Sequence, residues 1–157
     1  MMKLVIVEDE DIIREGLISY IDWNKLGHEV VGEAMNGKQG LEIVREKNPD
    51  VILTDIRMPV MDGLQMLQEL RNENNDTSAV ILSGYEDLEY ARSAMKLGVS
   101  DYILKPLNIR KLEEVMGRIY QEYSTKKERT AEYQRLKRWE NDNSQQAQKN
   151  LFEMVNL

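Results

Sequence analysis

The sequence predicts an α/β domain built on a doubly wound parallel sheet, followed by a helical extension. Short apolar runs rich in β-branched residues alternate five times with segments of helical periodicity, as in a series of strand–helix units. Four of these five runs are almost continuously apolar, as in parallel strands that are buried on both faces. Right-handed crossovers between such strands place helices on both faces of the sheet. The length of 157 residues suits one domain with an appendage.

Each apolar run is short enough to be one strand of the sheet. The five strands are expected at Leu4–Val7, Glu29–Glu33, Val51–Thr54, Ala79–Leu82 and Asp101–Leu104.

Three of the intervening segments carry apolar stripes at helical spacing. The stripes consist of Leu64, Leu67 and Leu70, of Leu88, Ala91 and Met95, and of Leu112, Val115 and Ile119. Asp62 and Asn108 precede the first and third stripes, where a side-chain oxygen caps the helix. Gly98 follows the second stripe, at the position that favours a left-handed turn after a helix. We therefore expect amphipathic helices that pack against the sheet.

The composition changes near Ser124, and we divide the chain there into a domain of residues 1–123 and a linker of residues 124–157. The linker holds 7 Lys and Arg against 5 Asp and Glu, whereas residues 1–123 hold 14 against 23. No Gly or Pro follows Gly117, so the last helix is expected to continue through the linker. The best heptad seam is half polar and consists of Tyr133, Leu136, Glu140, Asn143, Ala147, Asn150, Met154 and Leu157. A solvated helix and a coiled coil both remain open.

Composition excludes several functions for these residues. The formal net charge of −7 argues against nucleic-acid or membrane binding. The basic residues around Trp139 are interspersed with Glu, which favours a solvated helix over a nucleic-acid patch. There is no Cys, so disulfide and thiolate chemistry are absent. No apolar run approaches the roughly 20 residues of a membrane span, and no signal peptide is evident. We expect a cytoplasmic protein.

Polar side chains with complementary chemistry follow the expected strands. Glu8 and Asp9 follow the first strand, Asp55 the third, Ser83 the fourth and Lys105 the fifth. In an open parallel sheet, ligands bind beyond the carboxyl ends of the strands. Clustered carboxylates repel unless a cation compensates, and Mg²⁺ prefers oxygen ligands and phosphate. A carboxylate also acts as a nucleophile towards phosphoryl groups, assisted by Mg²⁺ and a nearby Lys. The pattern indicates Mg²⁺-dependent phosphoryl chemistry.

Four motifs, taken in order, resemble the receiver domain of two-component response regulators over about residues 3–123. The motifs are Val5-Ile6-Val7-Glu8-Asp9-Glu10, Leu53-Thr54-Asp55-Ile56-Arg57-Met58-Pro59 with Met61-Asp62-Gly63, Leu82-Ser83-Gly84, and Asp101-Tyr102-Ile103-Leu104-Lys105-Pro106. The resemblance implies a flavodoxin-like sheet with strand order 2-1-3-4-5. It also implies that a sensor histidine kinase transfers a phosphoryl group to this domain.

The resemblance assigns roles to individual residues. Asp55 would accept the phosphoryl group, and Lys105 and Ser83 would contact it. Mg²⁺ would bind to Glu8, Asp9, Asp55 and the backbone carbonyl of Arg57, with Glu8 acting through a water. Many receivers have Asp where this chain has Glu8, which keeps the charge but lengthens the side chain. The peptide bond between Lys105 and Pro106 would be cis.

A second group of stretches resembles receivers fused to AraC-type helix-turn-helix output domains. These stretches are Ile13–Leu17, Ile21–Trp23, Leu26–Ala34 and Ser83–Ala91. No such output domain lies within residues 1–157, so the chain is expected to end in the linker before it. The domain would contact DNA only through that output domain. We also expect phosphorylation to favour a homodimer.

Alternative interpretations stand beside this one. A receiver-like domain that binds partners without phosphorylation usually lacks an acidic residue or the Lys, and none is missing here. A haloacid-dehalogenase-type phosphatase needs a second acid two residues after Asp55, where this chain has Arg57. Tyr102 is either an ordinary strand residue or an aromatic switch that turns inward when Ser83 engages phosphate. His28, the only His, lies outside the strand-end set and is interpreted as a structural or surface residue, not as a ligand.

Overall fold

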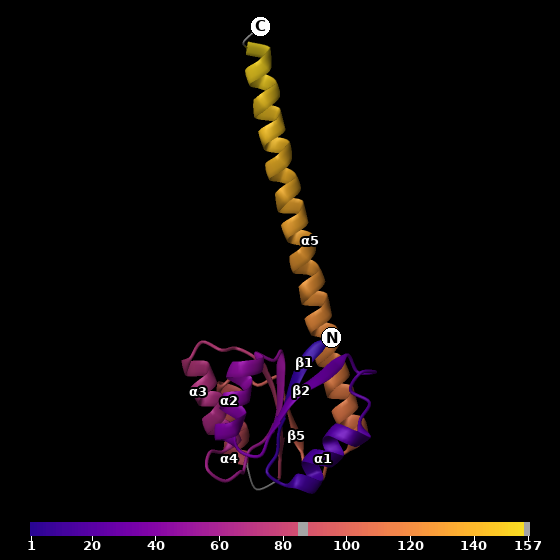
Figure 1. The fold of residues 1–157 in the computed structure, drawn as a ribbon, viewed down its shortest axis with the longest axis vertical. Helices are drawn as coiled ribbons and strands as arrows, with labels where there is room; N and C mark the ends of the chain where they lie inside the picture. Colours follow the sequence, from indigo (N-terminus) through magenta and orange to yellow (C-terminus); the bar gives the residue numbers. More distant parts are fainter. Residues whose placement is uncertain (85–87, 156–157) are drawn as a thin grey trace. The chain divides into compact units, whose positions relative to one another are not determined.

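The computed structural model describes residues 1–84 and 88–155, except for the side chains of residues 146, 147 and 150–155. Five parallel strands form one sheet with the order β2-β1-β3-β4-β5, which confirms the predicted fold and strand order. The strands are β1 (Met2–Val7), β2 (His28–Ala34), β3 (Val51–Asp55), β4 (Ser78–Ser83) and β5 (Asp101–Leu104) (Figure 1). The observed strands contain every predicted strand and extend some of them by one or two residues.

Helices cover both faces of the sheet. They are α1 (Asp11–Tyr20), α2 (Gly37–Lys47), α3 (Gly63–Asn72), α4 (Leu88–Lys96) and α5 (Ile109–Val155). Residues of α2, α3 and α4 share a buried apolar cluster with β1, β3 and β4, and Figure 1 shows α1 and the start of α5 on the opposite face of the sheet. The doubly wound arrangement is therefore the expected one.

Two predicted helix caps are confirmed. The Asp62 side chain accepts a hydrogen bond from the Gln65 backbone N–H, and the Gln65 side chain returns one to the Asp62 backbone N–H. This capping box satisfies backbone donors that the first turn of α3 leaves unpaired. Asn108 caps α5 by accepting from the Lys111 N–H at 3.2 Å. Gly98 has a φ of +71°, as predicted for the turn after α4.

The apolar stripe predicted for α4 does not face the sheet. Leu88 and Met95 are 66% and 74% exposed, and the residue of α4 that is fully buried is Ala94. The small Ala94 side chain packs into the cluster that includes Ala79 and Ile81. Because the helix rests on a small residue, its larger apolar side chains are left on the outside. The stripes of α3 and α5 do face the core.

His28 has the structural role that the sequence suggested. It is 1% exposed, and its Nε2 lies 2.7 Å from the carbonyl oxygen of Met116 in α5. Its ring makes edge contacts with the rings of Trp23 and Tyr120. Gly27, with a φ of +88°, brings its backbone against the Tyr120 ring, where any Cβ would collide. Gly27 and the first residue of β2, His28, thus anchor α5 at Tyr120 and Met116.

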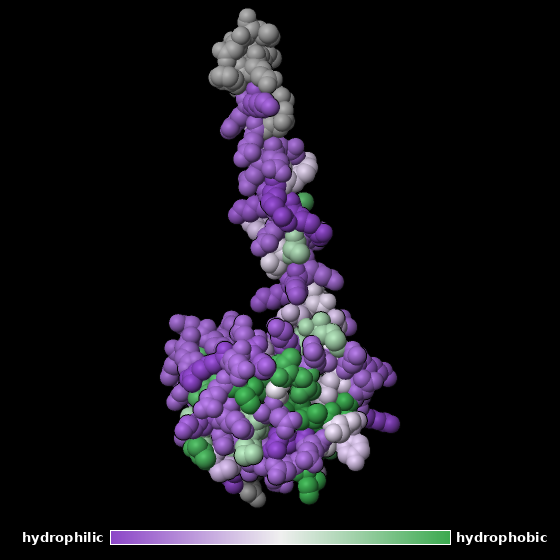
Figure 2. Space-filling model, in the orientation of Figure 1, coloured by the Kyte–Doolittle hydropathy of each residue, from purple (hydrophilic) through white to green (hydrophobic). Residues whose placement is uncertain are grey.

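The chain divides into two compact units, residues 1–120 and residues 121–157. The second unit is helical through Val155, and the described side chains from Thr125 onwards are exposed. Its surface is mostly hydrophilic (Figure 2), with Tyr133, Leu136 and Trp139 as exposed apolar side chains. The rest of the heptad seam, from Ala147 on, lies outside the described side chains, so the solvated helix and the coiled coil both stay open. None of the described helices is long and apolar enough to cross a membrane.

Candidate functional site

Strand register brings the predicted site residues to one edge of the sheet. Val7 pairs with Thr54, so the next residues lie side by side: Glu8 directly after β1 and Asp55 at the end of β3. Asp55 pairs with Leu82, one residue before Ser83. Ser83 in turn pairs with Leu104, and the Lys105 N–H donates to the Ser83 carbonyl at 2.6 Å. The carboxyl ends of four neighbouring strands therefore meet, as the topology requires.

Three carboxylates form the acidic part of this edge. Glu8, Asp9 and Asp55 each offer an oxygen, and these oxygens lie within 4.8 Å of one another. Glu8 is 1% exposed. Its burial, followed by the interaction with Asp55, raises the pKa of Glu8 from 4.5 to about 8. The two carboxyl groups can share a hydrogen bond only when one of them is protonated. With both ionised, no described donor lies within hydrogen-bonding distance of either Glu8 oxygen.

This donor set fits a magnesium ion. Mg²⁺ prefers carboxylate oxygens and keeps several waters, and the three carboxylates here come from two adjacent strand ends. The two buried oxygens of Glu8 lack donors from the described residues, and a divalent cation would supply the missing positive charge. The expected role of the Arg57 carbonyl stays a prediction.

Lys105 places a positive charge beside the carboxylates of Asp55 and Glu8. Its Nζ donates to Asp55 Oδ2 at 2.9 Å and lies 3.6 Å from Glu8 Oε1. Burial by itself lowers the pKa of Lys105, but the hydrogen bond and charge of Asp55, with the charge of Glu8, raise it overall. The ammonium therefore stays charged at neutral pH. The peptide bond between Lys105 and Pro106 is cis.

Asp55 is held in a fixed orientation and still reaches solvent. Its Oδ1 accepts from the Ile56 backbone N–H at 2.7 Å, while its Oδ2 accepts from Lys105. The residue is 9% exposed. Behind it, the Gly63 N–H donates to the Ile56 carbonyl at 2.7 Å, and a Cβ on Gly63 would collide with the Asp55 carbonyl oxygen. The chain after Asp55 thus folds back closely, and this approach requires glycine.

The remaining predicted residues lie around this centre. Ser83 is 1% exposed, and its Oγ lies 3.4 Å from the Gly84 carbonyl oxygen. Tyr102 on β5 pairs with Ile81 and packs, half-buried, against the apolar cluster under α4. The Arg57 guanidinium lies 5.8 Å from the centre of the Tyr90 ring. Residues 85–87 of the Ser83–Ala91 stretch lie outside the described residues.

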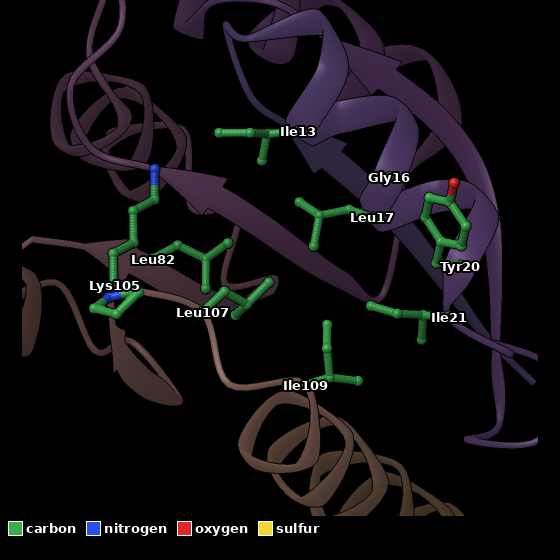
Figure 3. Close-up of a pocket in the computed structure, with 10 residues that line it drawn as sticks. Ile13, Gly16, Leu17, Tyr20, Ile21, Leu82, Lys105, Leu107 and Ile109 are labelled. Atoms are coloured by element: carbon green, nitrogen blue, oxygen red, sulfur yellow. The ribbon is translucent and has the colours of Figure 1, made fainter.

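An apolar groove adjoins the site. Its volume is about 620 Å³, and it lies between α1 with the residues after it, the end of β4 and the loop before α5. Ile13, Leu17 and Ile21 line one side, with Leu107 and Ile109 facing them (Figure 3). Lys105 lies at the edge of this groove and also contacts Asp55.

Arg14 is a residue that the sequence interpretation did not connect with the site. It is 8% exposed and donates from Nη1 to the carbonyl oxygen of Glu8 at 2.8 Å. The available signal was its place on α1, three residues before the buried Leu17 on the same face. A charged residue on the inward face of a helix needs a partner.

Comparisons with known proteins agree with this geometry. The model of the response regulator receiver domain family matches residues 4–116. The uncharacterized transcriptional regulatory protein YesN of Bacillus subtilis (strain 168) is 37% identical over 123 residues, covering 76% of this chain and 33% of YesN. The transcriptional regulatory protein HptR of Staphylococcus aureus (strain NCTC 8325 / PS 47) is 37% identical over 119 residues, covering 76% of this chain and 46% of HptR.

A solved structure also matches. The REC domain of AraT, a response regulator from Geobacillus stearothermophilus, has a TM-score of 0.74 and 36% identity, covering 80% of this chain and 98% of that domain. The match to YesN takes in a third of that protein and the match to HptR less than half of it. The chain therefore spans under half the length of these curated relatives.

Proposed function

Because this chain belongs to the response regulator receiver domain family, we propose that Asp55 accepts a phosphoryl group from the phosphohistidine of a sensor histidine kinase. A receiver domain is not a conventional enzyme, and the only reactions that it would catalyse are its own phosphorylation and dephosphorylation. The observation that carries the proposal is the set of groups around the Asp55 carboxylate. Its carboxylate reaches solvent, lies beside Glu8 and Asp9, and accepts a hydrogen bond from Lys105 at 2.9 Å.

The transfer is an in-line displacement at phosphorus. An oxygen of Asp55 forms a bond to phosphorus while the bond from phosphorus to the histidine nitrogen breaks, and the departing imidazole keeps the electron pair and takes a proton. Lys105, already 2.9 Å from Oδ2, neutralises charge on the transferred group. Ser83 lies one residue beyond the strand partner of Asp55, at the same edge of the sheet. There it would form a hydrogen bond with a phosphoryl oxygen.

We assign Glu8, Asp9, Asp55 and the Arg57 carbonyl as the residues that hold Mg²⁺, with Glu8 acting through a water. When bound, the ion supplies charge neutralisation at the phosphoryl oxygens. The buried Glu8 oxygens, which no described donor bonds, and the pKa of Glu8, raised by burial and by Asp55, support this assignment, because a divalent cation would favour the ionised carboxylate.

We assign the apolar groove beside Lys105 to the kinase. A phosphohistidine must come within bonding distance of Asp55, so its carrier has to contact the surface around the site. The groove offers Ile13 and Leu17 of α1 and Leu107 of the opposite side next to that position (Figure 3). An apolar helix face is the partner chemistry that fits such a lining.

The proposed output is a change of conformation and assembly. A phosphoryl group adds about 1.5 to 2 negative charges and strong acceptors at one point. Ser83 and Lys105 would move towards it, and Tyr102 would turn inward to follow Ser83. We infer that residues 1–123 form the receiver, and that residues 124–157 link it to a DNA-binding output domain of AraC type in the bacterial cytoplasm. YesN and HptR, both named as transcriptional regulatory proteins, extend beyond the matched region, which supports such an arrangement.

Mass spectrometry after incubation with Mg²⁺ and acetyl phosphate tests the proposal. We expect a single phosphoryl adduct on the wild type and none on Asp55→Asn, because the amide keeps the shape of the carboxylate but is not a nucleophile. Asp101→Asn is the matched control, since Asp101 begins β5 and pairs with Arg118. A phosphorylation-independent domain would give no adduct on any variant, and a phosphatase would turn over substrate; either result would refute the assignment.

A further inference from the structure

Arg14 has a set of partners that a surface arginine lacks. Its Nη1 donates to the Glu8 carbonyl oxygen at 2.8 Å, its Nε to Glu33 Oε1 at 3.2 Å and its Nη2 to Asp11 Oδ1 at 2.7 Å. The guanidinium is nearly buried, whereas the carboxylates of Asp11 and Glu33 are 71% and 52% exposed. One side chain therefore joins α1, the end of β1 and the end of β2.

We propose that Arg14 is a positioning residue for the metal site, which fixes the Glu8–Asp9 segment so that both carboxylates face Asp55. This inference rests on the proposed Mg²⁺-dependent function. Arg14 does not touch the phosphoryl group or the ion. It acts through the backbone of Glu8.

The backbone of Glu8 is held from two sides. Its N–H donates to the Ala34 carbonyl at 2.9 Å, at the end of β2. Its carbonyl accepts from Arg14, which also bonds Glu33, the residue before Ala34. Both hydrogen bonds therefore hold the Glu8 backbone in place relative to the end of β2. Without the second tether the peptide after Glu8 loses the hydrogen bond to its carbonyl oxygen, and a rotation of that peptide would move Asp9.

The tether opposes a definite force. Glu8 is buried without a donor to its carboxylate among the described residues and lies beside the carboxyl group of Asp55. When both carboxyl groups are ionised, as metal binding requires, repulsion between them favours any movement that separates them. A guanidinium with a fixed fork of donors resists such movement, because three of its nitrogens are bonded in different directions. A lysine ammonium at the same position is a single flexible point and cannot hold these three acceptors in one geometry.

A purely structural role would have a different signature. The pair between Arg14 and Asp11 is an i,i+3 contact on α1 and would by itself support only the first turn of that helix. Loss of such a contact lowers stability and leaves the intrinsic affinity for Mg²⁺ unchanged. A positioning role predicts a loss of affinity beyond any loss of stability. Partners of metal ligands typically contribute 10- to 100-fold in affinity, by roughly this mechanism.

The test is an Mg²⁺ titration of Arg14→Lys in the full chain, in which NMR monitors the amide signals of Asp9 and Asp55. We expect the Mg²⁺ dissociation constant to rise about tenfold. Arg71→Lys is the matched control, because Arg71 also donates to two backbone carbonyls, those of Leu97 and Asn75, in the turns that follow α4 and α3. The control should lose stability and keep the wild-type dissociation constant.

The outcomes separate this inference from the proposed function. Wild-type affinity in Arg14→Lys, or an equal loss in Arg71→Lys, overturns the positioning role alone. Failure of the wild type to bind Mg²⁺ overturns the proposed function and the positioning role together. If Arg14→Lys does not fold, the double variant Asp11→Ala with Glu33→Ala removes two acceptors of the guanidinium at exposed positions. A several-fold rise of its dissociation constant supports the role, and an unchanged one refutes it.

Discussion

At the scale of single residues, Glu8 determines how the site responds to pH. In the metal-free protein its pKa is raised to about 8, first by burial and then by Asp55. The folded protein therefore keeps this proton in a range where the unfolded chain, with an ordinary pKa of 4.5, has lost it. The free energy of unfolding contributed by Glu8 is complete below the unfolded pKa and is lost as pH rises through the folded one. Without Mg²⁺, this residue destabilises the fold at alkaline pH.

We predict that Mg²⁺ binds more tightly as pH rises towards the pKa of Glu8. The ion, acting through a water, favours the ionised form of Glu8, whereas the proton neutralises it, so the dissociation constant should fall up to about tenfold per pH unit below the pKa. Calorimetric titrations at several pH values measure this slope. Glu8→Gln, which cannot ionise, should bind more weakly and with a flatter dependence. An equal slope in both proteins would show that another group carries the proton.

Val60 is a second residue with a measurable effect. It has a φ of +70° and is 77% exposed in the turn between β3 and α3. A β-branched side chain in this left-handed conformation is strained, whereas Asn adopts it with little cost. We predict that Val60→Asn raises the free energy of unfolding by about 1 kcal/mol in urea denaturation. Asn74, exposed with a φ of +60°, is the reverse control, because Asn74→Val should destabilise by a similar amount. Equal stability of Val60→Asn and wild type would contradict the strain.

The sequence indicated the site residues that follow strands, but it did not indicate the residues whose partners are main-chain carbonyls. Asp55 and Lys105 were predictable because each follows a strand, and strand ends of a parallel sheet share one edge. Arg14 and Gly63 were not, because their partners are main-chain carbonyls of Glu8 and Asp55. A backbone acceptor has no residue type, so no sequence pattern marks it. Such contacts emerge only when the loop geometry is known.

At the scale of elements, the sequence predicted strands better than helix faces. A strand buried on both faces is apolar throughout, so β1 and β3 were evident from composition alone. For α4, the same apolar residues were compatible with two orientations, and the structure buries Ala94 while Leu88 and Met95 face outward. Periodicity identifies an apolar face but does not identify what covers it. The outward face of α4 is therefore available to a partner.

The contact between His28 and α5 gives the second element-scale prediction. Burial lowers the pKa of His28, and its hydrogen bond to the Met116 carbonyl opposes this shift without reversing it. As pH falls below the ordinary value of 6.5, the unfolded chain takes up a proton that the folded chain still refuses. The stabilisation is therefore complete above the unfolded pKa and is lost as pH falls towards the folded one. The anchor of α5 should weaken in acid.

Thermal unfolding of the wild type and His28→Gln between about pH 5 and pH 7.5 measures this contribution. Gln keeps an N–H donor for the Met116 carbonyl and does not titrate. We expect His28→Gln to be less stable at neutral pH and to lose less stability on acidification, with a difference in slope of at most about 1.4 kcal/mol per pH unit. Parallel curves would mean that His28 is protonated equally in both states. Asp50, whose charge acts on His28, is present in both proteins and cancels.

At the scale of the whole molecule, the strand order could be predicted from the sequence, and with it the edge where the candidate residues meet, but the assembly could not. The topology was constrained by alternation and handedness, together with the family resemblance. Association depends on exposed surface, and exposed side chains carry no periodicity that distinguishes an interface from solvent. The structure supplies what was missing by showing which apolar side chains are left outside. On α4 and β5 these include Leu88, Tyr90, Met95 and Leu104.

We predict that phosphorylation favours a homodimer through this surface of α4 and β5. Ser83 and Lys105 end the two strands that flank α4 in sequence, so a phosphoryl group on Asp55 acts on both ends of this segment. Arg118 and Asp101 pair across α5 and β5, which connects the same surface to the helix that leads into residues 121–157. Two-fold pairing would present two output domains together, as dimeric helix-turn-helix proteins require.

Sedimentation equilibrium of the full chain with and without beryllofluoride, a phosphoryl mimic, measures the association constant in both states. A coupling of ordinary strength corresponds to a rise of about 5- to 150-fold.

Met95→Glu should abolish the rise without affecting the fold, because Met95 is 74% exposed and the charge resists burial at an interface. Ile12→Glu, at an 85% exposed position on α1, is the matched control and should leave the rise intact. Ser83→Ala should reduce it, because the phosphoryl group then loses its contact with β4. An association constant that is equal in both states, or a rise that Ser83→Ala leaves unchanged, would disprove this route from Asp55 to the dimer.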